Sequence, residues 1–119
     1  MQTKDFTVFQ VLLSEIHQKA FNEPISKLSY SKAQMLSWLI SNDTNQIISY
    51  KSLIKYVDAV MAHCPQSINP NLTTLLILVE YHTGQKQEKL PVLVLWTAYQ
   101  KLLLTNTAVV ILNTKKLKI

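Results

Sequence analysis

The sequence at residues 72–79 is LTTLLILV. At helical spacing, Leu75 lies on one side of this stretch and Ile77 on the opposite side. A helix that is apolar on nearly every side has to be covered by the rest of the protein. We therefore predict an inward-facing central helix here, which begins at Asn69-Pro70 and ends at Gly84.

Apolar residues at three- and four-residue intervals predict helices on both sides of this stretch. The first helix covers about residues 5–21. The second is capped by Ser29 or Ser31 and is broken by the polar run at 41–45. The third is capped by Ser49, and Pro65 closes it. A fifth, apolar on nearly every side, runs from Pro91 to about residue 104.

These patterns predict an all-α fold, a compact five-helix domain that spans residues 1–119 as a single unit. The end of the chain leaves an alternative open. Residues 108–112 are rich in β-branched side chains, so the stretch from 102 to 112 could instead form a short C-terminal β-hairpin or strand. A basic tail follows at about 113–119.

The bulk composition narrows the setting of the protein. Cys64 is the only cysteine, which excludes an intrachain disulfide, and the N-terminal residues lack the apolar core of a signal peptide. We therefore predict a reducing, cytoplasmic location. Residues 90–113 are largely apolar but contain Lys101 and several polar residues, so we interpret them as core and do not expect a membrane partner.

The sequence offers little for catalysis or for ligand chemistry. His17, His63 and His82 are the only imidazoles, and none belongs to a metal-binding pattern. The acidic residues are dispersed, and one glycine cannot form a Gly-rich phosphate loop. We predict that the protein is not an enzyme and uses no metal or cofactor.

The net charge of +5 raises the question of nucleic-acid binding, although all twelve cations are lysines. Basic and aromatic residues alternate only in the third helix, where Tyr50 and Tyr56 flank two lysines, and lysines cluster only at the C-terminus. The residues that we predict to contact a partner or a nucleic acid are Tyr50, Lys51, Lys55, Lys115, Lys116 and Lys118.

A run of short motifs lies between Leu28 and Leu76: Leu28-Ser29, Leu39-Ile40, Ile47-Ile48-Ser49 and Leu53-Ile54. With these motifs, the stretch resembles the winged-helix DNA-binding domains of bacterial response regulators and their membrane-anchored relatives. The resemblance implies a DNA-binding unit with its recognition helix at about residues 68–76. The sequence departs from that family at Lys32, where the family has an acidic residue, and at 73–80, which carries no cation.

Two functions follow from these observations. The first is a non-enzymatic helical binding or regulatory module that acts through protein–protein contacts. Its partner would be another protein or a second copy of itself, held at an uncovered strip of residues 75–79 or 92–96. The alternative is a winged-helix-like DNA-binding transcriptional regulator that contacts phosphates through its lysines.

Overall fold

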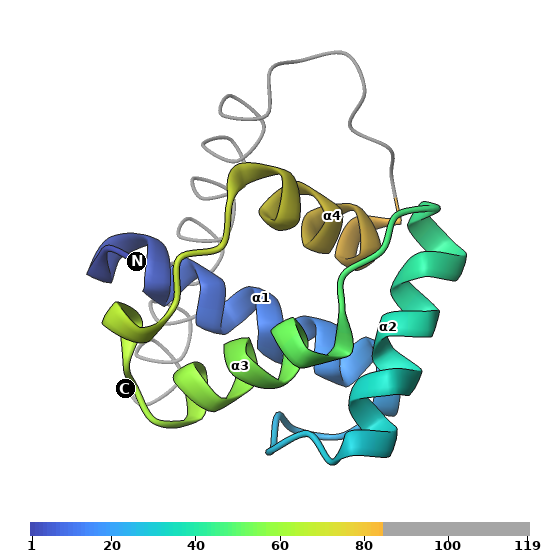
Figure 1. Cartoon of the computed structure of the whole chain (residues 1–119), viewed down its shortest axis with the longest axis horizontal. Helices are drawn as coiled ribbons and strands as arrows, with labels where there is room; N and C mark the ends of the chain where they lie inside the picture. The colour runs from blue at the N-terminus through green and yellow to red at the C-terminus, as the bar shows by residue number, and fades with distance from the viewer. Residues whose placement is uncertain (85–119) are drawn as a thin grey trace, which may run out of the picture.

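The structure is a computed structural model that describes residues 1–84. Its elements are α1 (Thr3–Phe21), α2 (Tyr30–Thr44), α3 (Tyr50–Met61), a short 3-10 turn η1 (Pro65–Ser67) and α4 (Leu72–Thr83) (Figure 1). Over these residues the prediction of a helical fold is confirmed, with no strand. The predicted fifth helix from Pro91, the hairpin or strand within 102–112 and the basic tail at 113–119 lie outside the described residues.

Side chains next to the helices decide where three of them begin. The hydroxyl oxygens of Ser29 and Ser49 each accept a hydrogen bond, at 3.2 Å, from the backbone N–H three residues further along α2 and α3. The cap at Ser49 was predicted, and Ser29 is the one of the two predicted alternatives, Ser29 and Ser31, that caps α2. The predicted start of α4 at Asn69-Pro70 was wrong: the side chain of Asn71 caps the helix, which begins at Leu72.

The second helix ends within the predicted run 41–45, but only at the last residue of that run, because α2 continues through Thr44. The buried hydroxyl of Thr44 donates to the carbonyl of Ile40 at 2.7 Å, so this polar side chain is satisfied within the helix. The helix ends at Asn45, which adopts the left-handed conformation with φ of 58°. Gly84 ends α4 in the same conformation, as predicted.

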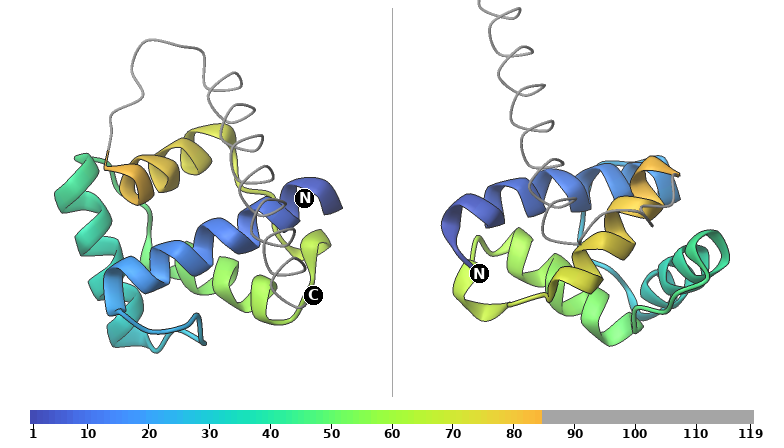
Figure 2. Two further views of the ribbon diagram at one scale, coloured as in Figure 1. Left: turned by 180° about the vertical axis from the view of Figure 1, so that it is seen from behind. Right: turned by 90° about the horizontal axis from the view of Figure 1, so that it is seen from above.

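The four α-helices of residues 1–84 surround one hydrophobic core. Helices α3 and α4 each pack against both α1 and α2. Figure 1 shows α1 behind α3 and α4, with α2 at one side of the molecule, and Figure 2 shows the same arrangement from behind and from above. The largest side chains that are fully buried include Phe9, Leu12, Ile16, Ile40, Leu53 and Leu78.

Helix α4 is buried over most of its surface, in agreement with the prediction that it turns inward. Leu75, Val79 and Tyr81 are buried, as are Ile77 and Leu78. The two residues at its start, Leu72 and Thr73, are exposed instead. Four of the five residues at 75–79 are therefore buried, and Leu76 between them is half-buried.

Among residues 1–84, no helix has both the length and the apolar character that crossing a bilayer requires.

The same substitution at two positions of α4 tests this burial. Leu78 is fully buried, so Leu78→Ala removes packed methyl groups, and we expect the free energy of unfolding to fall by about 2–5 kcal/mol. Leu72 is 38% exposed, so Leu72→Ala is the matched control, with an expected change within about 1 kcal/mol. Urea titrations followed by circular dichroism would measure both, and equal losses would contradict the inward orientation of α4.

Candidate functional site

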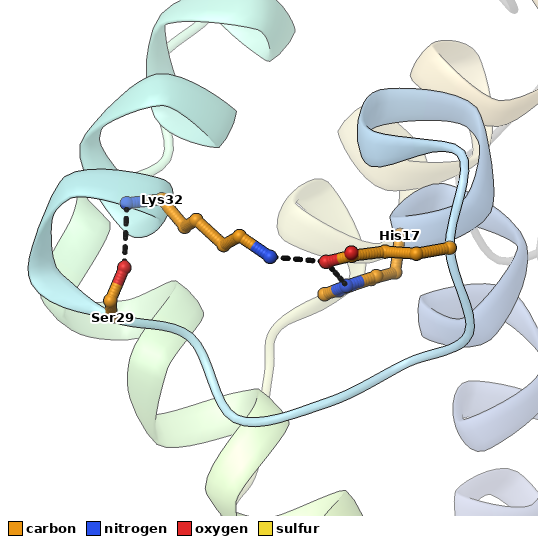
Figure 3. A network of polar contacts seen from close by, with 4 residues as sticks. His17, Ser29 and Lys32 are labelled. Atoms are coloured by element: carbon orange, nitrogen blue, oxygen red, sulfur yellow. Dashed lines mark hydrogen bonds and ion pairs between the residues drawn. The ribbon is translucent and has the colours of Figure 1, made fainter.

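A polar network joins the end of α1 to the start of α2 (Figure 3). Lys32 reaches back from the first turn of α2 and forms an ion pair with Glu23, which lies in the connection between the two helices. The same Glu23 oxygen lies 3.4 Å from Nε2 of His17, whose side chain is buried in α1. Lys32 thus stabilises the junction of the two helices through a carboxylate that is distant in sequence.

A second network joins the C-terminal ends of three helices. The ammonium group of Lys19 in α1 donates a hydrogen bond to the carbonyl of Tyr81 in α4 and lies 4.4 Å from the centre of that tyrosine ring. It also lies 3.7 Å from a carboxylate oxygen of Asp43 in α2. Lys32 and Asp43 are the only charged residues of α2. Asp43 is paired with Lys19 of α1, and Lys32 is paired with Glu23 in the connection between α1 and α2.

The opposite side of α2 is exposed and carries no charge. We call this surface the α2 outer face and define it by exposed residues spaced three or four apart: Ser31, Met35, Trp38, Asn42 and Asn45. Met35 is 55% exposed and Trp38 is 64% exposed, both high values for large apolar side chains. Helix α2 lies at the edge of the molecule in all three views, with its outer side away from the other described helices (Figures 1 and 2).

Apolar exposure continues just beyond this helix. Ile47 lies in the connection to α3 and is 79% exposed. The connection is held against α2, because the hydroxyl of Ser37 donates to the carbonyl of Ile48 at 2.6 Å. Ile47 therefore adds exposed apolar surface at a defined position beside the C-terminal end of α2.

Tyr50, one of the predicted contact residues, has a structural role in the described part of the chain. Its hydroxyl forms a hydrogen bond of 2.6 Å with the hydroxyl of Tyr30, and the two ring centres lie 4.9 Å apart. This hydrogen bond raises the pKa of Tyr30 above its ordinary value. The pair joins the start of α2 to the start of α3.

The other predicted residues separate into two groups. Lys51 and Lys55 are exposed, one turn apart on α3, and neither forms an ion pair within residues 1–84. They line an open hollow of about 450 Å³ together with Asp58, and Lys55 also borders a second hollow of about 640 Å³ next to η1. Lys115, Lys116 and Lys118 lie outside the described residues.

The charge of the protein is unevenly distributed along its sequence. Residues 1–84 contain six lysines and six acidic residues, so the formal excess of +5 comes entirely from residues 85–119. Lys51 and Lys55 are thus a local pair of cations on a part of the chain that is neutral as a whole. Long-range attraction to DNA depends on all the charges of a protein, so the excess of +5 applies to the full chain.

The part of the chain that the structure describes contains no group of three His, Cys, Asp or Glu side chains that could hold a metal ion. His17 is buried in the junction network, and Nδ1 of His63 lies 3.1 Å from the Gln10 amide. Burial lowers the pKa of His82. The lone Cys64 is half-buried.

Comparisons with protein-family models, with curated proteins and with solved structures give no match for this chain.

Met35 and Trp38 were not among the contact residues predicted from the sequence. The position of Trp38 relative to the apolar stripe of α2 would have indicated its exposure. Trp38 is two residues from both Leu36 and Ile40, which are buried, so a helix turns it to the opposite side. Spacing, rather than hydrophobicity, would have placed Trp38 on the surface.

The junction network predicts how stability depends on pH. The hydrogen bond from Lys32, followed by that with His17, lowers the pKa of Glu23 below its ordinary value of 4.5. The folded state therefore favours the ionised carboxylate, and this contribution is present above pH 4.5 and lost as the pH falls through the lowered value. We expect Glu23→Gln to be less stable than the wild type at pH 7 and to lose less stability between pH 5 and about pH 3.

Urea titrations at several pH values would measure this difference. The matched control is Asp58→Asn, which removes an exposed carboxylate that has no ion pair among the described side chains. If Glu23→Gln flattens the acid limb no more than Asp58→Asn does, the junction network does not stabilise the fold in the way described.

Proposed function

We propose that this chain is a non-enzymatic interaction module that binds another polypeptide through the α2 outer face. The observation that carries the proposal is the exposure of Trp38 beside Met35 on a helix side without charge. Tryptophan and methionine are enriched at protein interfaces, whereas charged residues are depleted at interface centres. Contiguous apolar surface of this kind on a small domain typically marks a contact site.

The α2 outer face is also held in place before any partner arrives. Ser29 caps the start of α2, and the hydroxyl of Thr44 donates to a carbonyl within its last turn. Ion pairs of Lys32 and Asp43 join the two ends of the helix to neighbouring elements. A helix that is already ordered loses little conformational freedom on binding, so more of the contact energy appears as affinity. The support for the proposal is therefore both the composition of this face and its rigidity.

This proposal moves the contact site relative to the sequence-based expectation. An uncovered strip at residues 75–79 was one expected site, but α4 is buried there. The other expected strip, residues 92–96, lies outside the described residues. Helix α2, which was not among the expected contact strips, provides the open apolar surface.

We also propose that this contact occurs in a reducing, cytoplasmic setting. The basis is the sequence, whose single cysteine has no second cysteine to pair with. A binding role rather than a catalytic one is supported by the burial of His17 and by the lack, among the described residues, of a cluster of His, Cys, Asp or Glu side chains that could hold a metal ion.

A photo-crosslinking experiment tests the contact face. Benzoylphenylalanine would replace Asn42 on the α2 outer face or, as the matched control, Lys51 on the exposed side of α3. After irradiation of cells that express the full chain, we expect discrete covalent adducts from position 42. Combination with Trp38→Ala should remove most of them, because tryptophans at interfaces commonly contribute 2 kcal/mol or more (about thirtyfold in affinity). The absence of adducts at 42, or the same adducts from 51, would contradict the proposal.

One observation favours DNA binding as a second candidate function. Lys51 and Lys55 project from adjacent turns of α3 without an ion pair within residues 1–84, so both ammonium groups are free to meet phosphates. Together with Lys115, Lys116 and Lys118, they are the lysines that the sequence predicts to contact DNA. This candidate ranks second because Lys115, Lys116 and Lys118 lie outside the described residues, so only two of the five lysines are seen on the surface.

A salt titration against random duplex DNA tests this second candidate. On this hypothesis, the full chain binds in the micromolar range at low salt. The double variant Lys51→Ala/Lys55→Ala should make the slope of log K against log salt shallower by about 1.8, because two phosphate contacts are lost. Met61→Ala, an exposed apolar change on the same helix, should leave the slope unchanged. No binding at tens of micromolar would remove this candidate.

A further inference from the structure

We propose that the occupant of the α2 outer face is a second copy of this chain, whose own α2 lies antiparallel to the first across a two-fold axis near Trp38. This inference rests on the proposed function, since it names the partner for the same surface. The charges of α2, the order of residues along it and the size of its exposed face support a second copy as the partner.

The lack of charge on the α2 outer face suits contact between two identical copies. In a two-fold contact, a residue near the axis faces its own copy, so any charge there meets a like charge. The five residues of the α2 outer face carry none. Of the two charged residues of the helix, Lys32 is paired with Glu23, and Asp43, which is exposed, lies 3.7 Å from Lys19. Such a face can contact itself without electrostatic repulsion.

The exposed sides of α1 and α3 differ in this respect. Lys51, Lys55 and Asp58 are exposed on α3, and Glu15 and Lys19 are exposed on α1. A two-fold axis through either of these helix surfaces would bring like charges close together, which costs affinity. A partner that is recognised by its charge would therefore bind α3 better than α2. The uncharged α2 outer face fits the same face of a second chain.

The order of residues along the helix supports the antiparallel arrangement. Trp38 lies near the middle of α2, which runs from Tyr30 to Thr44. When two such helices cross antiparallel at Trp38, Met35 contacts the region of Ser41 and Asn42 of the copy. Ser31 then meets Asn45, so an apolar centre is bordered by polar side chains that can form hydrogen bonds, which is the usual anatomy of an interface.

The size of the face sets the expected affinity. A helix of 15 residues is about 22 Å long, so one helix packed on its copy gives an interface at the low end of specific contacts, below about 1,200 Å². Ile47 adds apolar area beside the end of the helix. We therefore expect a reversible dimer with a dissociation constant in the micromolar range rather than an obligate one.

Sedimentation equilibrium of the full chain between about 5 and 500 µM tests the dimer, since this range brackets the expected micromolar dissociation constant. The average mass should rise from one chain to two, and Trp38→Ala should weaken the association at least tenfold. The matched control is Met61→Ala, which shortens an exposed apolar side chain on α3 and should leave the association unchanged. Thermal unfolding of each variant would show that the monomer still folds.

A charge-exchange experiment distinguishes self-contact at Trp38 from any other association. Trp38→Lys and Trp38→Glu should each be monomeric, because each places two like charges at the axis. Their equimolar mixture should associate again, since lysine then faces glutamate. A mixture that stays monomeric while the wild type dimerises would place the interface elsewhere and overturn the assignment.

Two further measurements test whether the paired α2 helices run antiparallel and whether the partner is a second copy. In a Cys64→Ser background, Gln34→Cys and Asn42→Cys chains should form mixed disulfides faster than either forms them alone, because an antiparallel pair brings position 34 near position 42 of the copy. Faster pairing of identical positions would indicate parallel helices and overturn the arrangement. If the wild type stays monomeric at 500 µM while benzoylphenylalanine at position 42 crosslinks to a different protein, the second-copy assignment fails and the proposed function stands. If the wild type stays monomeric and no crosslinked adduct forms from position 42, the second-copy assignment and the proposed function both fail.

Discussion

The need to cover α4 governs the arrangement of the described part of the chain. Its apolar side chains point in several directions, with Leu75 and Ile77 on opposite sides, so a single neighbour could not remove them from water. Helices α1 and α2 both pack on α4, and α3 packs against the same two helices. The inner side of α2 is used in this packing, and its outer side is left at the edge of the molecule (Figure 1).

The distribution of charge follows from the same packing. Because α2 lies next to the end of α1, Lys32 reaches Glu23 and Asp43 reaches Lys19, so the two charges of α2 help to join the helices. What remains on the outer face is apolar or neutral, as in Met35, Trp38 and Asn42. The same contacts that stabilise the fold thus leave a surface better suited to another polypeptide than to phosphates.

Local sequence rules predicted much of this fold and little of its site. The helical period, the serine caps at Ser29 and Ser49 and the stop at Gly84 depend on residues within one turn, so they could be read in advance. The predicted start of α4 was wrong because Pro70 lies before the helix, and the side chain of Asn71 caps it. The polar run 41–45 does contain the end of α2, but the helix continues to Thr44, whose hydroxyl is satisfied within the helix.

The amino-acid sequence by itself determined which segments of residues 1–84 are helical, and that α4 must be buried, because helix formation and apolar periodicity are properties of neighbouring residues. Only the tertiary structure decided that Trp38 is exposed, that Tyr50 is bonded to Tyr30, and that Lys32 is paired with Glu23. These outcomes depend on which helices pack side by side, and that is a balance of contacts between residues far apart in the chain. A hydrophobic side chain marks a surface to be covered, but whether the fold or a partner covers it depends on how many helices are available to surround it.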